Sequence, residues 1–167
     1  MFKTRDLVII ALISAISYTL SMIVVFRMPQ GGSITLYLVP LLIAAFNDNF
    51  KNCLMIGIVT SVLQVVIGGY ILNPVQVMFD YFIPVTIICI SGYLIKRKDR
   101  TLTTNLIGFG LACVISLLSY VCSGILFYET PFLPSLIYNA TFFIPTIIIN
   151  IIVFLIINQP LSKVYPK

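Results

Sequence analysis

Long apolar runs, separated by short polar turns, constrain this chain more than any other feature of its sequence. Six runs cover residues 6–26, 34–46, 53–67, 74–95, 102–127 and 133–158. A helix needs about 20 mostly apolar residues to cross the hydrocarbon core of a bilayer. Hydrophobic residues make up 60% of the 167-residue chain and charged residues only 9%, whereas soluble domains are about 25% charged. We therefore predict an all-α integral membrane protein, a six-transmembrane-helix bundle that forms a single membrane domain over residues 1–167.

The distribution of basic residues predicts how this bundle is oriented in the lipid bilayer. If both termini are cytoplasmic, Arg27 lies outside and the other nine basic residues lie inside, namely Lys3, Arg5, Lys51, Lys96, Arg97, Lys98, Arg100, Lys163 and Lys167. Because Lys and Arg accumulate in cytoplasmic loops, this asymmetry predicts an even number of spans with both termini inside. The net charge of +5 then reflects topology, and we expect no nucleic-acid partner.

Several classes of function are excluded by residues that the chain lacks. It has no histidine, and its four cysteines are isolated within apolar runs, without a CxxC pair. This pattern argues against a metal site and a metal cofactor, and it is typical of cysteines that serve as small core residues. There is also no GxSxG sequence, no phosphate-binding loop and no pair of carboxylates within a span. We therefore predict a non-catalytic protein that needs no cofactor.

Asp80 is the candidate around which a binding site can be predicted. Apart from Asp6 beside the N-terminal basic pair, it is the only charged residue within a predicted span. A carboxylate at the centre of a membrane helix costs about 2.5–3.5 kcal/mol, so it should face a cavity or a partner. Gln76 lies four residues earlier, on the same helix face. The alternative is that Asp80 only forms hydrogen bonds between helices.

The fifth and sixth predicted helices also place polar and aromatic residues in the outer half of the membrane, at the depth expected for Asp80. Tyr120 and Tyr128 follow one another on the fifth predicted helix, and Asn139 lies near the start of the sixth. An amide within a span needs a partner, which favours a role for Asn139. Tyr128 alone is equally well explained as part of an aromatic belt at the membrane interface. Together with Asp80, these residues predict a small-solute site in the outer half of the membrane.

The first predicted helix carries two small residues at positions four apart. Ala11 and Ala15 interrupt an otherwise Leu- and Ile-rich sequence. Small-xxx-small spacing lets a second helix approach closely, and close packing drives helix association in lipid. The pair marks either packing within the bundle or a docking face for another protein.

Four segments resemble a known family, the thiamine-specific substrate-binding (S) components of energy-coupling factor transporters. The strongest likeness is in MPQGGSITLYLVPLLIAAF (28–46) and GGYILNPVQVMFDYF (68–82), with looser likeness in YVCSGILFY (120–128) and SLIYNATFFIP (135–145). The resemblance implies a vitamin-binding subunit in the plasma membrane of a bacterium. It also implies partners: a transmembrane scaffold subunit, docked on the Ala11 and Ala15 face, and two ATPase subunits.

The resemblance further implies which residues hold the vitamin. Asp80 and Tyr81 match an acidic residue followed by Tyr in the fourth helix of family members. Tyr70 matches an aromatic residue of a loop, and Asn139 matches an amide of the sixth helix. With Gln76, Tyr120 and Tyr128, these residues form the expected substrate site.

This sequence departs from the family pattern in ways that leave the vitamin open. Well-known members have a His in the fifth helix and Trp in the binding loops, and this chain has neither. Tyr120 and Tyr128 occupy the corresponding fifth-helix places, and tyrosine can still stack on a cationic ring. Thiamine is the expected vitamin, and another cationic vitamin or a pyrimidine precursor is the alternative. A protein of another class, whose Asp80 and Asn139 only hold membrane helices together, is the second hypothesis.

Overall fold

The computed structural model describes residues 2–28, 32–95 and 101–164, with side chains described as far as residue 158. Four of its helices are long and apolar enough to cross a membrane: α1 (Thr4–Met22), α3 (Phe50–Gly68), α6 (Leu102–Phe127) and α7 (Phe132–Val164). Two shorter apolar helical segments cover Leu38–Asn47 (α2) and Pro74–Cys89. The chain is therefore a predominantly helical, multi-pass membrane protein.

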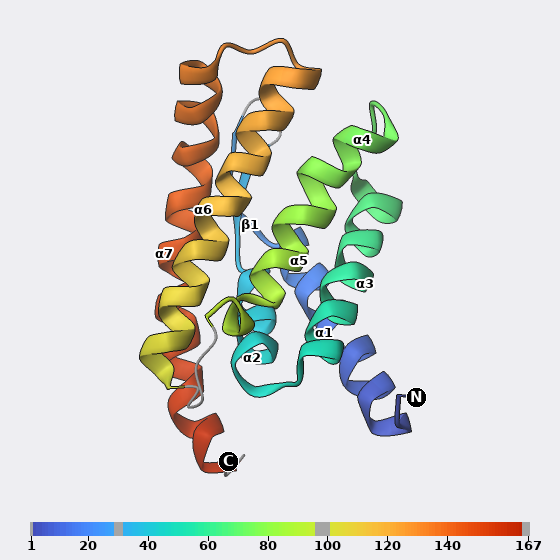
Figure 1. Ribbon diagram of the computed structural model, residues 1–167, viewed down its shortest axis with the longest axis vertical. Helices are drawn as coiled ribbons and strands as arrows, with labels where there is room; N and C mark the ends of the chain where they lie inside the picture. The colour runs from blue at the N-terminus through green and yellow to red at the C-terminus, as the bar shows by residue number, and fades with distance from the viewer. Residues whose placement is uncertain (1, 29–31, 96–100, 165–167) are drawn as a thin grey trace.

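The helices form one bundle with its two ends clearly distinguished (Figure 1). The long helices α6 and α7 run antiparallel and side by side, while α3 packs against α1 and against α5 (Ile83–Cys89). The start of α1 and the end of α7 lie toward the same end of the bundle. The α6–α7 connection and α4 (Pro74–Val77) lie toward the opposite end, which we call the α4 end.

A β-hairpin lies where helix was predicted, at the end of the first predicted span and at the start of the second. Helix α1 stops at Met22, and β1 (Val24–Arg27) pairs antiparallel with β2 (Ser33–Thr35). The predictions of helix up to residue 26 and from residue 34 were wrong at these positions, although the described chain is predominantly helical. The run of β-branched residues at 23–25 favours strand, a preference that apolarity alone conceals.

The fourth predicted span is helical but irregular. Its α-helical turn α4 passes into a π-helical turn, η1 (Met78–Phe82), and then into α5. Helix ends at Cys89 and a 3₁₀ turn, η2 (Ser91–Tyr93), follows, so the predicted end at residue 95 was too late. The expected cytoplasmic cluster at 96–100 and Lys167 lie outside the described residues, as does the side chain of Lys163.

Asn150 of α7 joins the hairpin, α2 and α7 at the centre of the bundle. Its Nδ2 donates to the Thr35 carbonyl at 2.7 Å, and its Oδ1 accepts the Val39 backbone N–H at 3.0 Å. The same N–H, in the first turn of α2, also lies 3.2 Å from the Leu36 carbonyl, and the N-cap residue Tyr37 gives no side-chain cap. Asn150 is fully buried. One amide therefore supplies partners to two backbone groups more than 110 residues away.

We predict that Asn150→Leu will lower the free energy of unfolding by about 1–3 kcal/mol, because it removes two buried hydrogen bonds, to the Thr35 carbonyl and from the Val39 N–H. The measurement is thermal or denaturant unfolding of the purified protein in detergent. Thr141→Val is the control, because the exposed Thr141 hydroxyl bonds only to its own helix, at the Ile137 carbonyl. That change should stay within about 0.5 kcal/mol. Equal stability of the two variants would contradict this role of Asn150.

Candidate functional site

The Asp80 carboxylate lies on the π-helical turn and is held by two neutral donors. Gln76, one turn earlier, donates its Nε2 to Asp80 Oδ2. The Tyr128 hydroxyl, at the end of α6, lies 3.5 Å from the same oxygen. Two predicted neighbours of Asp80 are therefore in contact with it. π-Helical turns occur often at functional sites, because they re-aim the side chains that they carry.

Gln76 also fixes the loop that precedes α4. Its side chain is fully buried. Its Oε1 accepts the Leu72 backbone N–H at 3.1 Å, and its Nε2 lies 3.2 Å from the Tyr70 carbonyl. The Tyr81 hydroxyl accepts the Tyr70 backbone N–H at 2.8 Å. The predicted residues Tyr70, Gln76 and Tyr81 thus lie together as one connected group.

Aromatic rings border this group on its open side. The rings of Tyr70 and Tyr128 have centroids 6.5 Å apart and planes inclined by 30°. Desolvation and the nearby Asp80 carboxylate raise the pKa of the Tyr128 phenol to about 12, so it remains a neutral donor at physiological pH. Tyr70 and Tyr128 are 62% and 45% exposed, so both rings are accessible. We call the five residues Tyr70, Gln76, Asp80, Tyr81 and Tyr128 the carboxylate cluster.

The carboxylate cluster contains no cation to balance Asp80. Within the described part of the chain, its carboxylate forms hydrogen bonds to Gln76 and Tyr128 but no ion pair with a Lys or Arg. A carboxylate in a membrane helix is costly unless it is paired, and neutral donors compensate only part of that cost. The site is therefore suited to a ligand that carries positive charge.

The other two predicted site residues, Tyr120 and Asn139, lie in different surroundings. Tyr120 packs edge-on against Phe143 of α7, with ring centroids 5.5 Å apart, and near Phe142. The Asn139 Nδ2 donates to the Ser135 carbonyl at 2.9 Å within its own helix. Among the described residues, no hydrogen bond or ring contact joins either side chain to the carboxylate cluster, but Tyr120 lies near enough to Asp80 and Tyr81 to interact with them electrostatically.

Tyr138 and Phe142 are neighbours of this second group that our sequence-based site did not include. The Tyr138 hydroxyl accepts the Gly32 backbone N–H at 3.0 Å, and its ring packs on Phe142 at 5.8 Å. Gly32 lies so close to Phe142 that an added Cβ would be 2.5 Å from the ring. The end of the hairpin is thus fixed onto α7. The GG sequence at 31–32 was a usable indication of close backbone approach.

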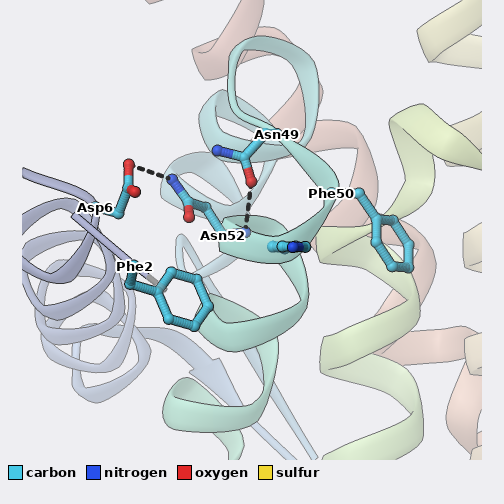
Figure 2. Close-up of a pocket in the computed structure, with 6 residues that line it drawn as sticks. Phe2, Asp6, Asn49, Phe50 and Asn52 are labelled. Atoms are coloured by element: carbon cyan, nitrogen blue, oxygen red, sulfur yellow. Dashed lines mark hydrogen bonds between the residues drawn. The ribbon is translucent and has the colours of Figure 1, made fainter.

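A shallow depression at the opposite end of the bundle contains none of the predicted substrate-binding residues (Figure 2). It is lined by Phe2, Asp6, Asn49, Phe50, Lys51 and Asn52. Asn52 Nδ2 lies 3.3 Å from Asp6 Oδ1 and 2.8 Å from Asp48 Oδ1, so it joins the starts of α1 and α3. This depression is therefore separate from the carboxylate cluster at the α4 end.

The two alanines of α1 face away from the bundle. Ala11 and Ala15 are exposed. The buried side of the same helix uses serines instead, with the Ser14 and Ser17 hydroxyls donating to the carbonyls of Ile56 and Tyr37 at 3.3 and 2.8 Å. Small residues at 11 and 15 therefore form a shallow outward surface between larger exposed side chains such as Leu7 and Val8.

These features define a multi-pass membrane protein with a carboxylate site suited to a small cationic solute. A model of the family described as "Thiamine transporter protein" matches residues 7–165. The curated protein Thiamine transporter ThiT of Bacillus subtilis is 29% identical, and the match covers 69% of each chain. A solved structure of ThiT from Listeria monocytogenes has the same fold, with a TM-score of 0.72 and 21% identity over 93% of this chain and 94% of that one.

The chain belongs to the thiamine transporter protein family. This membership confirms the family that the motifs at 28–46 and 68–82 indicated. It also places the chain among transporters, as predicted, and not among enzymes.

We predict that Gln76→Leu will loosen the loop before α4 while the bundle stays folded. Loss of the bond to the Leu72 amide should raise its hydrogen exchange about fivefold, as for a bond of about 1 kcal/mol. Exchange of a peptide that covers residues 69–73 measures this. Gln64→Leu is the matched control, because Gln64 lies on α3 and contacts no residue of the carboxylate cluster by any hydrogen bond described. Similar exchange in both variants would reject the role of Gln76.

Proposed function

We propose that this protein is the vitamin-binding S subunit of an energy-coupling factor importer and that its vitamin is thiamine. The observation that carries the proposal is the carboxylate cluster, in which Asp80 is bordered by tyrosines and has no cationic partner among the described residues. Thiamine combines a cationic ring with an aminopyrimidine, so it offers a positive charge, aromatic faces and N–H donors. The names of the relatives in Bacillus subtilis and Listeria monocytogenes support the same vitamin.

The chemistry of each cluster residue suggests its part in binding. The Asp80 carboxylate would face the positive charge or the amino group of the vitamin, in a partly desolvated place where Coulomb attraction is stronger than in water. Tyr70 and Tyr128 would stack on a ring, since aromatic faces attract cations. Tyr81 and Gln76 would hold the loop of Tyr70, by the bonds that they already form.

Tyr120 and Asn139 would complete the site from the side of α6 and α7. Tyr120 offers a ring supported by Phe142 and Phe143. Asn139 donates only within α7, so its Oδ1 can accept a hydrogen bond from the vitamin. For these two residues to touch the same ligand as Asp80, the vitamin must extend between α6, α7 and the carboxylate cluster.

The topology that fits this function has six spans, with both termini in the cytoplasm of a bacterial cell. The segments Leu38–Asn47 and Pro74–Cys89 would be the two short spans, beside the four long helices. The start of α1 and the end of α7 lie toward one end, as an even number of spans requires. The carboxylate cluster would then open to the outside. The exposed Ala11 and Ala15 would dock a transmembrane scaffold subunit that two ATPase subunits drive.

A related cationic vitamin or a pyrimidine precursor is the second candidate ligand. The observation that favours it is the absence of Trp and His from the whole chain, because these residues occur in the well-known thiamine binders that the sequence resembles. Competition of each compound against radiolabelled thiamine ranks these ligands.

We predict that Asp80→Asn will weaken thiamine binding at least tenfold, or about 1.4 kcal/mol, because the variant loses the negative charge and keeps the shape. Equilibrium binding to purified protein measures the effect, and the melting temperature monitors folding. Asp6→Asn is the matched control, because Asp6 lies at the other end of the bundle, beside Asn52. It should leave affinity unchanged. A folded Asp80→Asn protein with full affinity would remove Asp80 from the site and favour a purely structural role.

We predict that the double variant Ala11→Trp, Ala15→Trp will lose thiamine uptake into cells and keep thiamine binding. The bulky rings would fill the surface on which a scaffold helix would pack. Uptake and binding are measured on the same double variant. The control places Trp at Leu12 and Ile16, which are 57% and 51% exposed on another side of α1, and it should retain uptake. Loss of binding together with uptake would assign the alanines to folding, and normal uptake would move the docking face elsewhere.

A further inference from the structure

The π-helical turn leaves one backbone carbonyl without a donor from its own helix. In this turn the Ile83 N–H bonds to the Met78 carbonyl, five residues earlier. The same pattern would pair the Phe79 carbonyl with the N–H of residue 84, but residue 84 is proline and has no N–H. An unpaired carbonyl within the membrane is costly. The Phe79 carbonyl, next to Asp80 in the chain, therefore needs a partner from outside the helix.

Ser119 of α6 supplies that partner. Its hydroxyl donates to the Phe79 carbonyl at 2.7 Å, and this is its single hydrogen bond among the described residues. Two other serines also reach this segment, but their shorter bonds are to their own helices. Ser61 lies 2.8 Å from the Gly57 carbonyl and 3.2 Å from that of Tyr81. Ser116 lies 2.8 Å from the Ala112 carbonyl and 3.2 Å from that of Pro84.

A serine in a helix can donate to the carbonyl four residues earlier. Ser61 and Ser116 do so through their shorter bonds, so we expect loss of either hydroxyl to affect the α4–α5 segment less than loss of the Ser119 hydroxyl. Ser119 has no such bond, and its side chain is buried, with 6% exposure. The Ser119 hydroxyl therefore donates its hydrogen bond to the π-helical turn.

We propose that Ser119 is a positioning residue, which stabilises the π-helical turn and so sets the direction of the Asp80 carboxylate toward the ligand. This role rests on the proposed function, because Asp80 is its target. If the turn returned to α-helical pairing, residues on one side of it would rotate by about 100°, the angle per residue of an α-helix. Such a rotation would separate Asp80 from Tyr128, which directly follows α6 and would not move with the turn.

The first test needs no ligand. Hydrogen exchange of a peptide covering residues 78–85 compares the ligand-free wild type, Ser119→Ala and the matched control Ser116→Ala. Ser119→Ala should raise exchange by about three- to tenfold, as expected for a lost hydrogen bond, and Ser116→Ala by less than about twofold. Unchanged exchange in a folded Ser119→Ala protein would overturn the proposal, whether or not the protein binds thiamine.

The second test asks whether Ser119 acts through Asp80. Ser119→Ala should weaken thiamine binding by about three- to tenfold, and Ser119→Thr, which keeps the hydroxyl, should restore it. In an Asp80→Asn background, the Ser119→Ala change should have less than about a twofold effect, because coupled residues are not additive. Equal losses in both backgrounds would show a general effect on the fold and overturn the positioning role. If Ser119→Ala does not fold, Ser119→Cys, with similar volume and a weak donor, serves in the same comparisons.

The outcomes separate the two proposals. A wild-type protein that does not bind thiamine overturns the proposed function, and the exchange experiment then decides on Ser119 alone. Binding that depends on Asp80 but not on Ser119 retains the proposed function and rejects the positioning role.

Discussion

A backbone group that leaves a helix's own hydrogen-bond ladder finds no water in a bilayer, and this constraint explains how the bundle is held together. Helix is interrupted at the hairpin, before α2 and at the π-helical turn. At each place a side chain from another helix forms a hydrogen bond with the backbone: Asn150 with Thr35 and Val39, Ser17 with Tyr37, and Ser119 with Phe79. The polar residues of this apolar chain are therefore placed where the backbone requires them, and non-helical backbone is tolerated because protein surrounds it.

The same constraint relates the candidate site to the fold. Pro84 disturbs the hydrogen bonding of its helix, and Asp80 and Tyr81 lie in the turn that results. With proline at 84, a regular α-helix would leave the Asp80 carbonyl without the N–H of residue 84, so the irregular turn and the carboxylate that it carries occur together. Sites of local irregularity are where function is most often found in a fold that otherwise follows regular rules.

How far the sequence predicted this structure depends on the range of the interactions concerned. The helical runs and the pairing of Gln76 with Asp80 follow from apolarity and from four-residue spacing, which are local properties. The likeness to a known family at 68–82 correctly indicated the family, and Tyr70, Tyr81 and Tyr128 do lie with Asp80. The hairpin was missed, because a Val- and Ile-rich segment is equally apolar as helix or strand. The roles of Asn150 and Ser119 were not predictable, since their partners lie 111 and 40 residues away in the chain.

The carboxylate cluster also indicates why a cationic ligand would be selected. Both neutral donors reach the same oxygen of Asp80, Oδ2, so a neutral ligand could add a hydrogen bond at Oδ1 but could not balance the negative charge. A cation adds an attraction that neither Gln76 nor Tyr128 can provide, and the low dielectric constant of a site that excludes water strengthens it. Gln76 need not leave the loop when this happens, because its Oε1 still accepts the Leu72 amide. The loop that carries Tyr70 can therefore remain ordered while the carboxylate turns toward the ligand, so little order has to be created on binding.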